Sequence, residues 1–139
     1  MKETKTVLIF GISSFVGSNL AEFLKDEYRV IGTYFSKPVE IPGVLTVKVD
    51  VLNKDQAQLI IQKFRPDYTI YAVGMTSVQD CFENTNESEA LNGSGIFNIA
   101  EYAQKYKSQL VHISSALVFS GEKESYLEKD NLNPTTDYG

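Results

Sequence analysis

The sequence has few of the residues that metal centres and disulfide scaffolds need. Its 139 residues include one cysteine, Cys81, and one histidine, His112. This count excludes an internal disulfide, a cysteine-based zinc site and an iron–sulfur cluster. We therefore expect a protein of a reducing, cytoplasmic compartment, with no metal site.

Positive charge and long apolar runs are also scarce. Lysine and arginine together number 13 against 18 acidic residues, which gives a net charge of −5. The lysines are scattered singly, so no basic stripe is available for a nucleic acid. The apolar segment that begins at Val7 is too short for a signal-peptide core or a membrane span. We expect neither a nucleic-acid nor a membrane partner.

Short β-branched stretches alternate with segments of helical spacing, and the length suits one domain. Five strands joined by right-handed crossovers predict an α/β fold, a Rossmann-like doubly wound parallel sheet in the order 3-2-1-4-5. Such sheets bind ligands at the carboxyl ends of their strands. The predicted strands are 7–10, 28–34, 44–49, 68–73 and 110–113; the predicted helices are 15–25, one capped by Asn53, and 87–106; the candidate loops are 11–17, 74–80 and 114–121.

A glycine-containing turn, Gly11-Ile12-Ser13-Ser14-Phe15-Val16-Gly17, lies directly between the first strand and its helix. At that place, backbone N–H groups can meet a pyrophosphate at the helix N-terminus. The alternative is an ordinary turn in which Gly11 supplies a positive φ and Gly17 allows close helix packing.

This loop resembles the Gly-x-x-Gly-x-x-Gly fingerprint of extended short-chain dehydrogenase/reductases, and further segments match that family's motifs in the same order. The best match within the family is to the dTDP-4-dehydrorhamnose reductase-like branch. The resemblance covers essentially the whole chain. The matching segments are Asp50-Val51, which resembles the acidic position at the adenine ring; Ala72-Val73-Gly74, the small-residue motif of strand four; Asn92-Gly93-Ser94-Gly95, the Asn-x-x-Gly of the long helix; and 112–121 and 134–139, which resemble the segments of the catalytic Ser or Thr and the catalytic Tyr.

The resemblance implies an NAD(P)-binding Rossmann domain over 1–139, part of an oxidoreductase that acts on a nucleotide sugar and dimerises through helices. Ser115 would hydrogen-bond the substrate oxygen, and Tyr138 would be the general acid or base. The implied cofactor-binding residues are Gly11, Ser13, Ser14, Phe15, Val16, Gly17, Ser36, Lys37, Asp50, Val51, Ala72, Val73, Gly74 and Asn92.

A free phenol is almost fully protonated at pH 7, so a catalytic tyrosine needs a group that lowers its pKa. In the family, a lysine four residues after the tyrosine has this role. That position lies beyond Gly139. We therefore expect a chain truncated after the tyrosine motif, without its C-terminal substrate domain. As a fragment it would be inactive or weakly active and would bind cofactor better than it turns over.

The sequence departs from the family's pattern at two places. Ser14 replaces the middle glycine, so its Cβ would crowd the pyrophosphate, although its hydroxyl could donate to a phosphate oxygen. The acid expected after strand two for the ribose 2′-OH is missing. Ser36 and Lys37 could instead accept a 2′-phosphate, which favours NADP over NAD; the alternative for Lys37 is a solvated loop.

A different class of function stays open, a non-catalytic cofactor-sensing or protein-interaction module that keeps the fold without a reaction. Two residues outside the motifs have plain interpretations. We expect His112, inside a predicted strand, to be covered by the sheet or the core, and Cys81 to be an inert small residue.

Overall fold

A five-stranded parallel sheet forms the centre of the computed structural model, which describes residues 4–139 of the predicted 1–139 domain. The observed order, β3-β2-β1-β4-β5, confirms the predicted doubly wound topology. The ladder of β4 ends at Tyr71 rather than at the predicted Val73. The strands are β1 (Thr6–Phe10), β2 (Arg29–Tyr34), β3 (Leu45–Lys48), β4 (Tyr68–Tyr71) and β5 (Gln109–His112).

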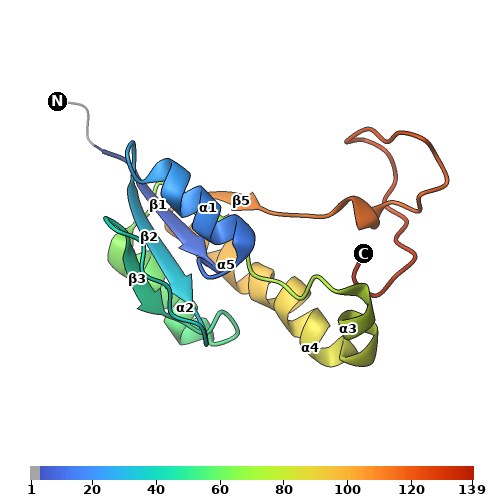
Figure 1. Ribbon diagram of the computed structural model, residues 1–139, viewed down its shortest axis with the longest axis horizontal. Helices are drawn as coiled ribbons and strands as arrows, with labels where there is room; N and C mark the ends of the chain where they lie inside the picture. Colours follow the sequence, from blue (N-terminus) through green and yellow to red (C-terminus); the bar gives the residue numbers. More distant parts are fainter. Residues whose placement is uncertain (1–3) are drawn as a thin grey trace.

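Helices cover both faces of the sheet (Figure 1). Helix α1 (Phe15–Leu24) lies on one face, where Ala21 packs with Val7 and Ile9 of β1. Helices α2 (Lys54–Phe64) and α5 (Gly95–Lys105) lie on the other, where the core includes Leu8, Phe10, Ile61 and Ile99. Because alternate residues of a strand point to opposite faces, β1 supplies both cores, and all five of its residues are buried.

The connection from β4 to β5 differs from the prediction in two ways. Residues 74–80 were predicted as a loop, but helix α3 (Val78–Glu83) begins within them, and its N-cap Ser77 accepts a hydrogen bond from Asp80 N–H at 3.2 Å. The helix predicted over 87–106 is divided into α4 (Thr85–Glu89), a π-helical turn (Ala90–Ser94) and α5. This connection therefore carries an irregular turn at its middle.

The segments that directly follow β4 and β5 extend beyond the carboxyl end of the sheet. Figure 1 shows α3, α4 and the segment after β5 on that side. This last segment, which includes the predicted loop 114–121, has no regular structure except for a single 3-10 turn at Ala116–Val118. Within residues 4–139, no helix is both long and apolar enough to cross a membrane.

Candidate functional site

The turn between β1 and α1 requires glycine at both of its ends. Gly11 has a φ of +85°, and a Cβ there would lie 2.7 Å from the carbonyl oxygen of Ala72 in the segment after β4. Gly17 is buried, and a Cβ there would run into the carbonyl oxygen of Gly11. The turn is therefore folded tightly on itself and against the segment that follows β4, which brings the start of α1 to the carboxyl edge of the sheet.

Ser14 is the N-cap of α1. Its hydroxyl accepts a hydrogen bond from Gly17 N–H at 3.0 Å and donates one to the Gly11 carbonyl at 2.8 Å. Phe15 and Val16 are the first two residues of the helix, so their N–H groups have no partner within it. Free amides and the positive end of the helix dipole suit a phosphate group.

Asn92, in the π-helical turn, holds the segment that follows β4. Its side-chain oxygen accepts from Met75 N–H at 2.9 Å, and its amide nitrogen donates to the Met75 carbonyl at 3.0 Å and to Ser88 Oγ at 3.3 Å. Nearby, the Tyr71 hydroxyl donates to the Leu91 carbonyl at 2.8 Å, and burial raises the pKa of Tyr71. The turn and the end of β4 are thus joined at two adjacent points.

Two cavities open at this edge of the sheet, of about 430 and 360 Å³. They share Ser14 and residues 72–74, so a ligand can extend from one into the other past the first turn of α1. The first is lined by Ser14, Phe15, Val16, Ala72, Val73, Gly74, Thr76, Asn92, His112, Ile113, Ser114, Ser115, Val118, Tyr138 and Gly139. The second is lined by Gly11, Ser13, Ser14, Thr33, Tyr34, Phe35, Val49, Asp50, Val51, Leu52, Ala72, Val73, Gly74, Glu87 and Leu91.

Most of the predicted site residues meet at these two cavities. Ser115 and Tyr138 line the first, and Asp50 and Val51 line the second. Three predicted residues line neither: Gly17 is buried beneath the turn, and Ser36 and Lys37 are exposed just beyond β2.

Sequence reasoning missed several residues of the cavity walls. His112 was predicted to be covered, but it is exposed and lines the first cavity, because β5 is an edge strand here and the histidine is its last residue. Phe35 and Glu87 line the second cavity. Position alone could have indicated His112 and Phe35, since both lie at the carboxyl ends of strands; nothing in the sequence indicated Glu87.

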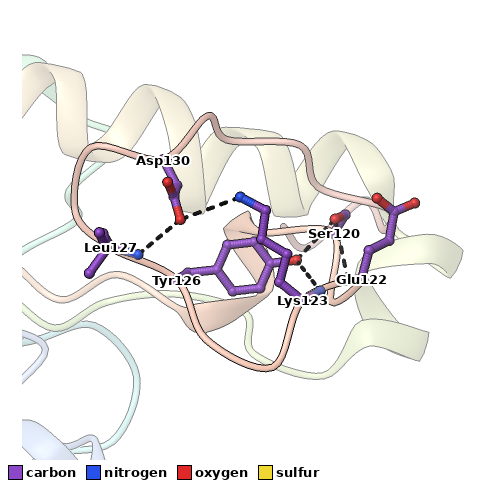
Figure 2. A network of polar contacts seen from close by, with 6 residues as sticks. All are labelled: Ser120, Glu122, Lys123, Tyr126, Leu127 and Asp130. Carbon is purple, nitrogen blue, oxygen red and sulfur yellow. Dashed lines mark hydrogen bonds and ion pairs between the residues drawn. The ribbon is translucent and has the colours of Figure 1, made fainter.

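The chain returns from Ser115 to Tyr138 through a loop that is folded on itself (Figure 2). The ring of Tyr126 stacks on Phe119 with centroids 4.5 Å apart, and its hydroxyl accepts from Lys123 N–H at 3.2 Å. Its hydrogen bond with Ser120, at 3.1 Å, lowers the pKa of Tyr126. Asp130 accepts from Leu127 N–H at 3.0 Å and lies 3.7 Å from the Lys123 ammonium. These contacts give the loop its own shape, outside the cavities.

Hydrogen bonds at the base of this loop bring the end of the chain back to the first cavity. Asn133 N–H donates to the Val118 carbonyl at 3.0 Å, and Gly139 N–H donates to Thr136 Oγ1 at 3.1 Å. The Ser115 hydroxyl accepts from Leu117 N–H at 3.2 Å. Ser115 and Tyr138, 23 positions apart in the sequence, therefore line one cavity.

Comparison with known proteins agrees with this arrangement. The model of the RmlD substrate binding domain family matches residues 5–139. The chain belongs to this family. The match confirms the resemblance to extended short-chain dehydrogenase/reductases that the motifs indicated, and it extends over nearly the whole sequence.

Individual members of the family are similar along the same length. A dTDP-4-dehydrorhamnose reductase of Aggregatibacter actinomycetemcomitans is 32% identical over 136 residues, which are 96% of this chain and 42% of that protein. A hypothetical dTDP-4-dehydrorhamnose reductase from Sulfolobus tokodaii superposes with a TM-score of 0.88 at 34% identity, over 96% of this chain and 48% of that one. The chain thus spans less than half the length of these relatives.

One solved relative holds a cofactor. The dTDP-4-dehydrorhamnose reductase from Bacillus anthracis, solved in complex with NADP, has a TM-score of 0.85 at 26% identity, over 99% of this chain and 46% of that one. The chain is therefore a member of a family that includes sugar-nucleotide reductases, with the fold of an NADP-bound relative.

Proposed function

We propose that this chain binds NAD(P) across the two cavities, as the cofactor-binding half of a reductase or epimerase-like enzyme of nucleotide sugars. The observation that carries this proposal is the meeting of both cavities at the glycine turn. Gly11 keeps the wall free of a Cβ that would lie 2.7 Å from the Ala72 carbonyl. The free N–H groups of Phe15 and Val16 suit a pyrophosphate at this junction.

The adenine half and the nicotinamide half of a dinucleotide need different contacts, and the two cavities are lined by different residues. The second cavity has apolar walls from Phe35 and Leu52 and a carboxylate from Asp50, which suit an adenine ring with its exocyclic amine. Asp50 Oδ1 accepts from Leu52 N–H at 2.9 Å, which fixes the carboxylate. The first cavity is lined by Ser115 and Tyr138, whose hydroxyls are the groups that would meet a substrate.

The roles of these two residues follow from their chemistry. When bound, NAD(P)H supplies a hydride to the carbonyl carbon of a keto sugar. The Ser115 hydroxyl hydrogen-bonds the carbonyl oxygen and polarises it, while the Tyr138 phenol transfers its proton to that oxygen as negative charge develops there. In the reverse direction the Tyr138 oxygen accepts the proton, so one residue is the acid or the base.

The division of the whole protein is also part of the proposal. The relatives are more than twice as long as the matched segment, which supports assigning the cofactor to this chain and most substrate contacts to a separate domain. The nucleotide-sugar substrate comes to this chain through the dTDP-4-dehydrorhamnose reductases that it is similar to. The homodimer and the cytoplasmic location stay predictions.

Calorimetry with NADPH and with NADH tests the binding. We expect each cofactor to release measurable heat and to raise the melting temperature, because a ligand at about 100 times its Kd stabilises the folded state by about 2.7 kcal/mol. Thymidine diphosphate without a nicotinamide cofactor serves as the comparison ligand. Absence of both heat and thermal shift with millimolar NADPH and NADH would refute the cofactor-binding proposal.

We also propose that NADP is preferred to NAD, through Ser36 and Lys37 beside the second cavity. Both are exposed and follow Phe35, which lines that cavity. Lys37→Ala should weaken NADP binding much more than NAD binding. A charge-assisted contact to the 2′-phosphate is worth roughly 1.5–3 kcal/mol, so the NADP/NAD affinity ratio should fall by about ten- to a hundredfold.

The matched control for Lys37→Ala is Lys63→Ala, which removes an exposed lysine from the last turn of α2. It should leave the NADP/NAD ratio unchanged. Titration of both variants with both cofactors at one ionic strength decides the matter, and equal losses of NADP and NAD in Lys37→Ala would show that Lys37 does not recognise the 2′-phosphate.

A further inference from the structure

Ser14 stands where the family's fingerprint has a glycine, and its hydroxyl is engaged within the turn. The oxygen accepts from Gly17 N–H at 3.0 Å, and the hydroxyl proton is donated to the Gly11 carbonyl at 2.8 Å. The backbone N–H of Ser14 donates to the same carbonyl at 3.0 Å. A serine hydroxyl has one proton, so while this contact holds it has none for a phosphate oxygen.

The same contacts decide which amides at the start of α1 are free to bind a ligand. The N–H of Gly17, the third residue of α1, donates to the Ser14 hydroxyl, so the N–H groups of Phe15 and Val16 are the free ones. Phe15 and Val16 line the first cavity, and Ser14 lines both cavities. A pyrophosphate that crosses between the cavities therefore passes the two free amides. The Ser14 hydroxyl beside it points to the Gly11 carbonyl instead.

We propose that Ser14 is a positioning residue: its hydroxyl holds the turn 11–17 in its binding shape before a ligand arrives, and the N–H groups of Phe15 and Val16 bind the pyrophosphate. This inference rests on the proposed function. A turn that is already ordered loses less conformational freedom on binding, and this gain offsets the crowding by the Ser14 Cβ. The serine then substitutes for the missing glycine by fixing the backbone rather than by freeing space.

A matched pair of variants separates the two effects of the side chain. Ser14→Ala and Ser14→Gly both lose the hydroxyl, and they differ only in the Cβ. We expect both to weaken the binding of ADP and NADPH by roughly 3- to 10-fold, the usual range for one lost hydrogen bond. Adenosine, which has no pyrophosphate, should bind all forms equally, and Ser14→Thr, which keeps a hydroxyl, should retain wild-type affinity for ADP. Tighter ADP binding by Ser14→Gly than by the wild type would overturn the proposal.

Loss of a helix cap also lowers stability, so a second cap provides the control. Asn53 caps α2 by accepting from Gln56 N–H at 3.1 Å, and it is not among the residues that line either cavity. Asn53→Ala should lower the melting temperature as Ser14→Ala does, while changing ADP affinity by less than about twofold. Equal losses of ADP affinity in the two variants would show that only helix stability matters, and would overturn the positioning role.

Hydrogen exchange of the Gly17 amide, followed by NMR, tests the contact without any ligand. The amide should be protected in the free wild type and in Ser14→Thr, should exchange at least about tenfold faster in Ser14→Ala, and should stay protected when ADP is added. Faster exchange of Gly17 on ADP binding would show that the hydroxyl turns to the phosphate instead, which overturns the proposal. If the wild type binds none of NADPH, NADH and ADP, the proposed function fails; if it binds them but Gly17 is unprotected in the free protein, the role of Ser14 alone fails.

Discussion

Gly11→Val should abolish the binding of NADPH and NADH and lower the melting temperature by about 10 °C. A valine at φ +85° carries backbone strain of roughly 1–2 kcal/mol, and its Cβ would lie 2.7 Å from the Ala72 carbonyl, which adds an overpacking cost of roughly 1–3 kcal/mol. The displaced segment at Ala72 belongs to the wall of both cavities. Calorimetry and thermal denaturation measure the two effects separately.

Gly43→Val provides the control, because Gly43 has nearly the same φ, +84°, with nothing within 4 Å of a built Cβ. It should show the strain alone, with a smaller fall in melting temperature and unchanged cofactor affinity. If Gly11→Val fails to fold, the milder Gly11→Ala should still bind at least about tenfold more weakly than Gly43→Ala. Wild-type affinity in a folded Gly11 variant would contradict the assignment of this turn to the cofactor.

Tyr138→Phe should lower the reduction of 4-keto sugar nucleotides by about 10²- to 10⁴-fold in a version of the protein extended past Gly139. The variant removes only the phenolic hydroxyl, which supplies the proton that the keto oxygen takes up, so the affinity for NADPH should stay the same. The measurement is NADPH oxidation at saturating cofactor. Tyr28→Phe is the control, since Tyr28 stacks edge-on with Tyr68 at the other end of the sheet, and it should keep full activity.

The 139-residue chain itself should show at most trace turnover in the same assay. None of the residues that line the first cavity, all of them within the described part of the chain, is a lysine or an arginine. A phenol without a neighbouring cation is a poor acid–base catalyst near neutral pH. Robust turnover by this chain that Tyr138→Phe leaves intact would show that other residues carry the chemistry.

The sheet and most of the site were predictable because they follow from short-range rules. Strand β1 contains an unbroken apolar run, residues 7–10, crossovers are right-handed, and strand ends meet at one edge. Helix α3 was missed because it has only six residues, too few for a helical repeat of apolar residues to distinguish it from a loop. Its N-cap, Ser77, was the available signal.

Other features depend on contacts between distant segments, which one sequence does not display. The π-helical turn coincides with the bonds that Tyr71 and Met75 make to Leu91 and Asn92. For Ser14, the sequence was compatible with two outcomes: its Cβ could crowd the pyrophosphate, or its hydroxyl could donate to a phosphate oxygen. The direction of the hydroxyl depends on how closely Gly11 and Gly17 approach each other.

The burial of β1 has a consequence for how the molecule opens by local unfolding. Strand β1 is buried on both faces and lies between β2 and β4. In β5, at one edge of the sheet, three of the four residues are exposed. Local opening therefore begins at the edge and reaches the centre last. The first cavity includes His112 from that edge, and the second borders β1 and β2. A ligand that spans both would join the least stable part of the sheet to its most stable part, and would slow the opening of the edge.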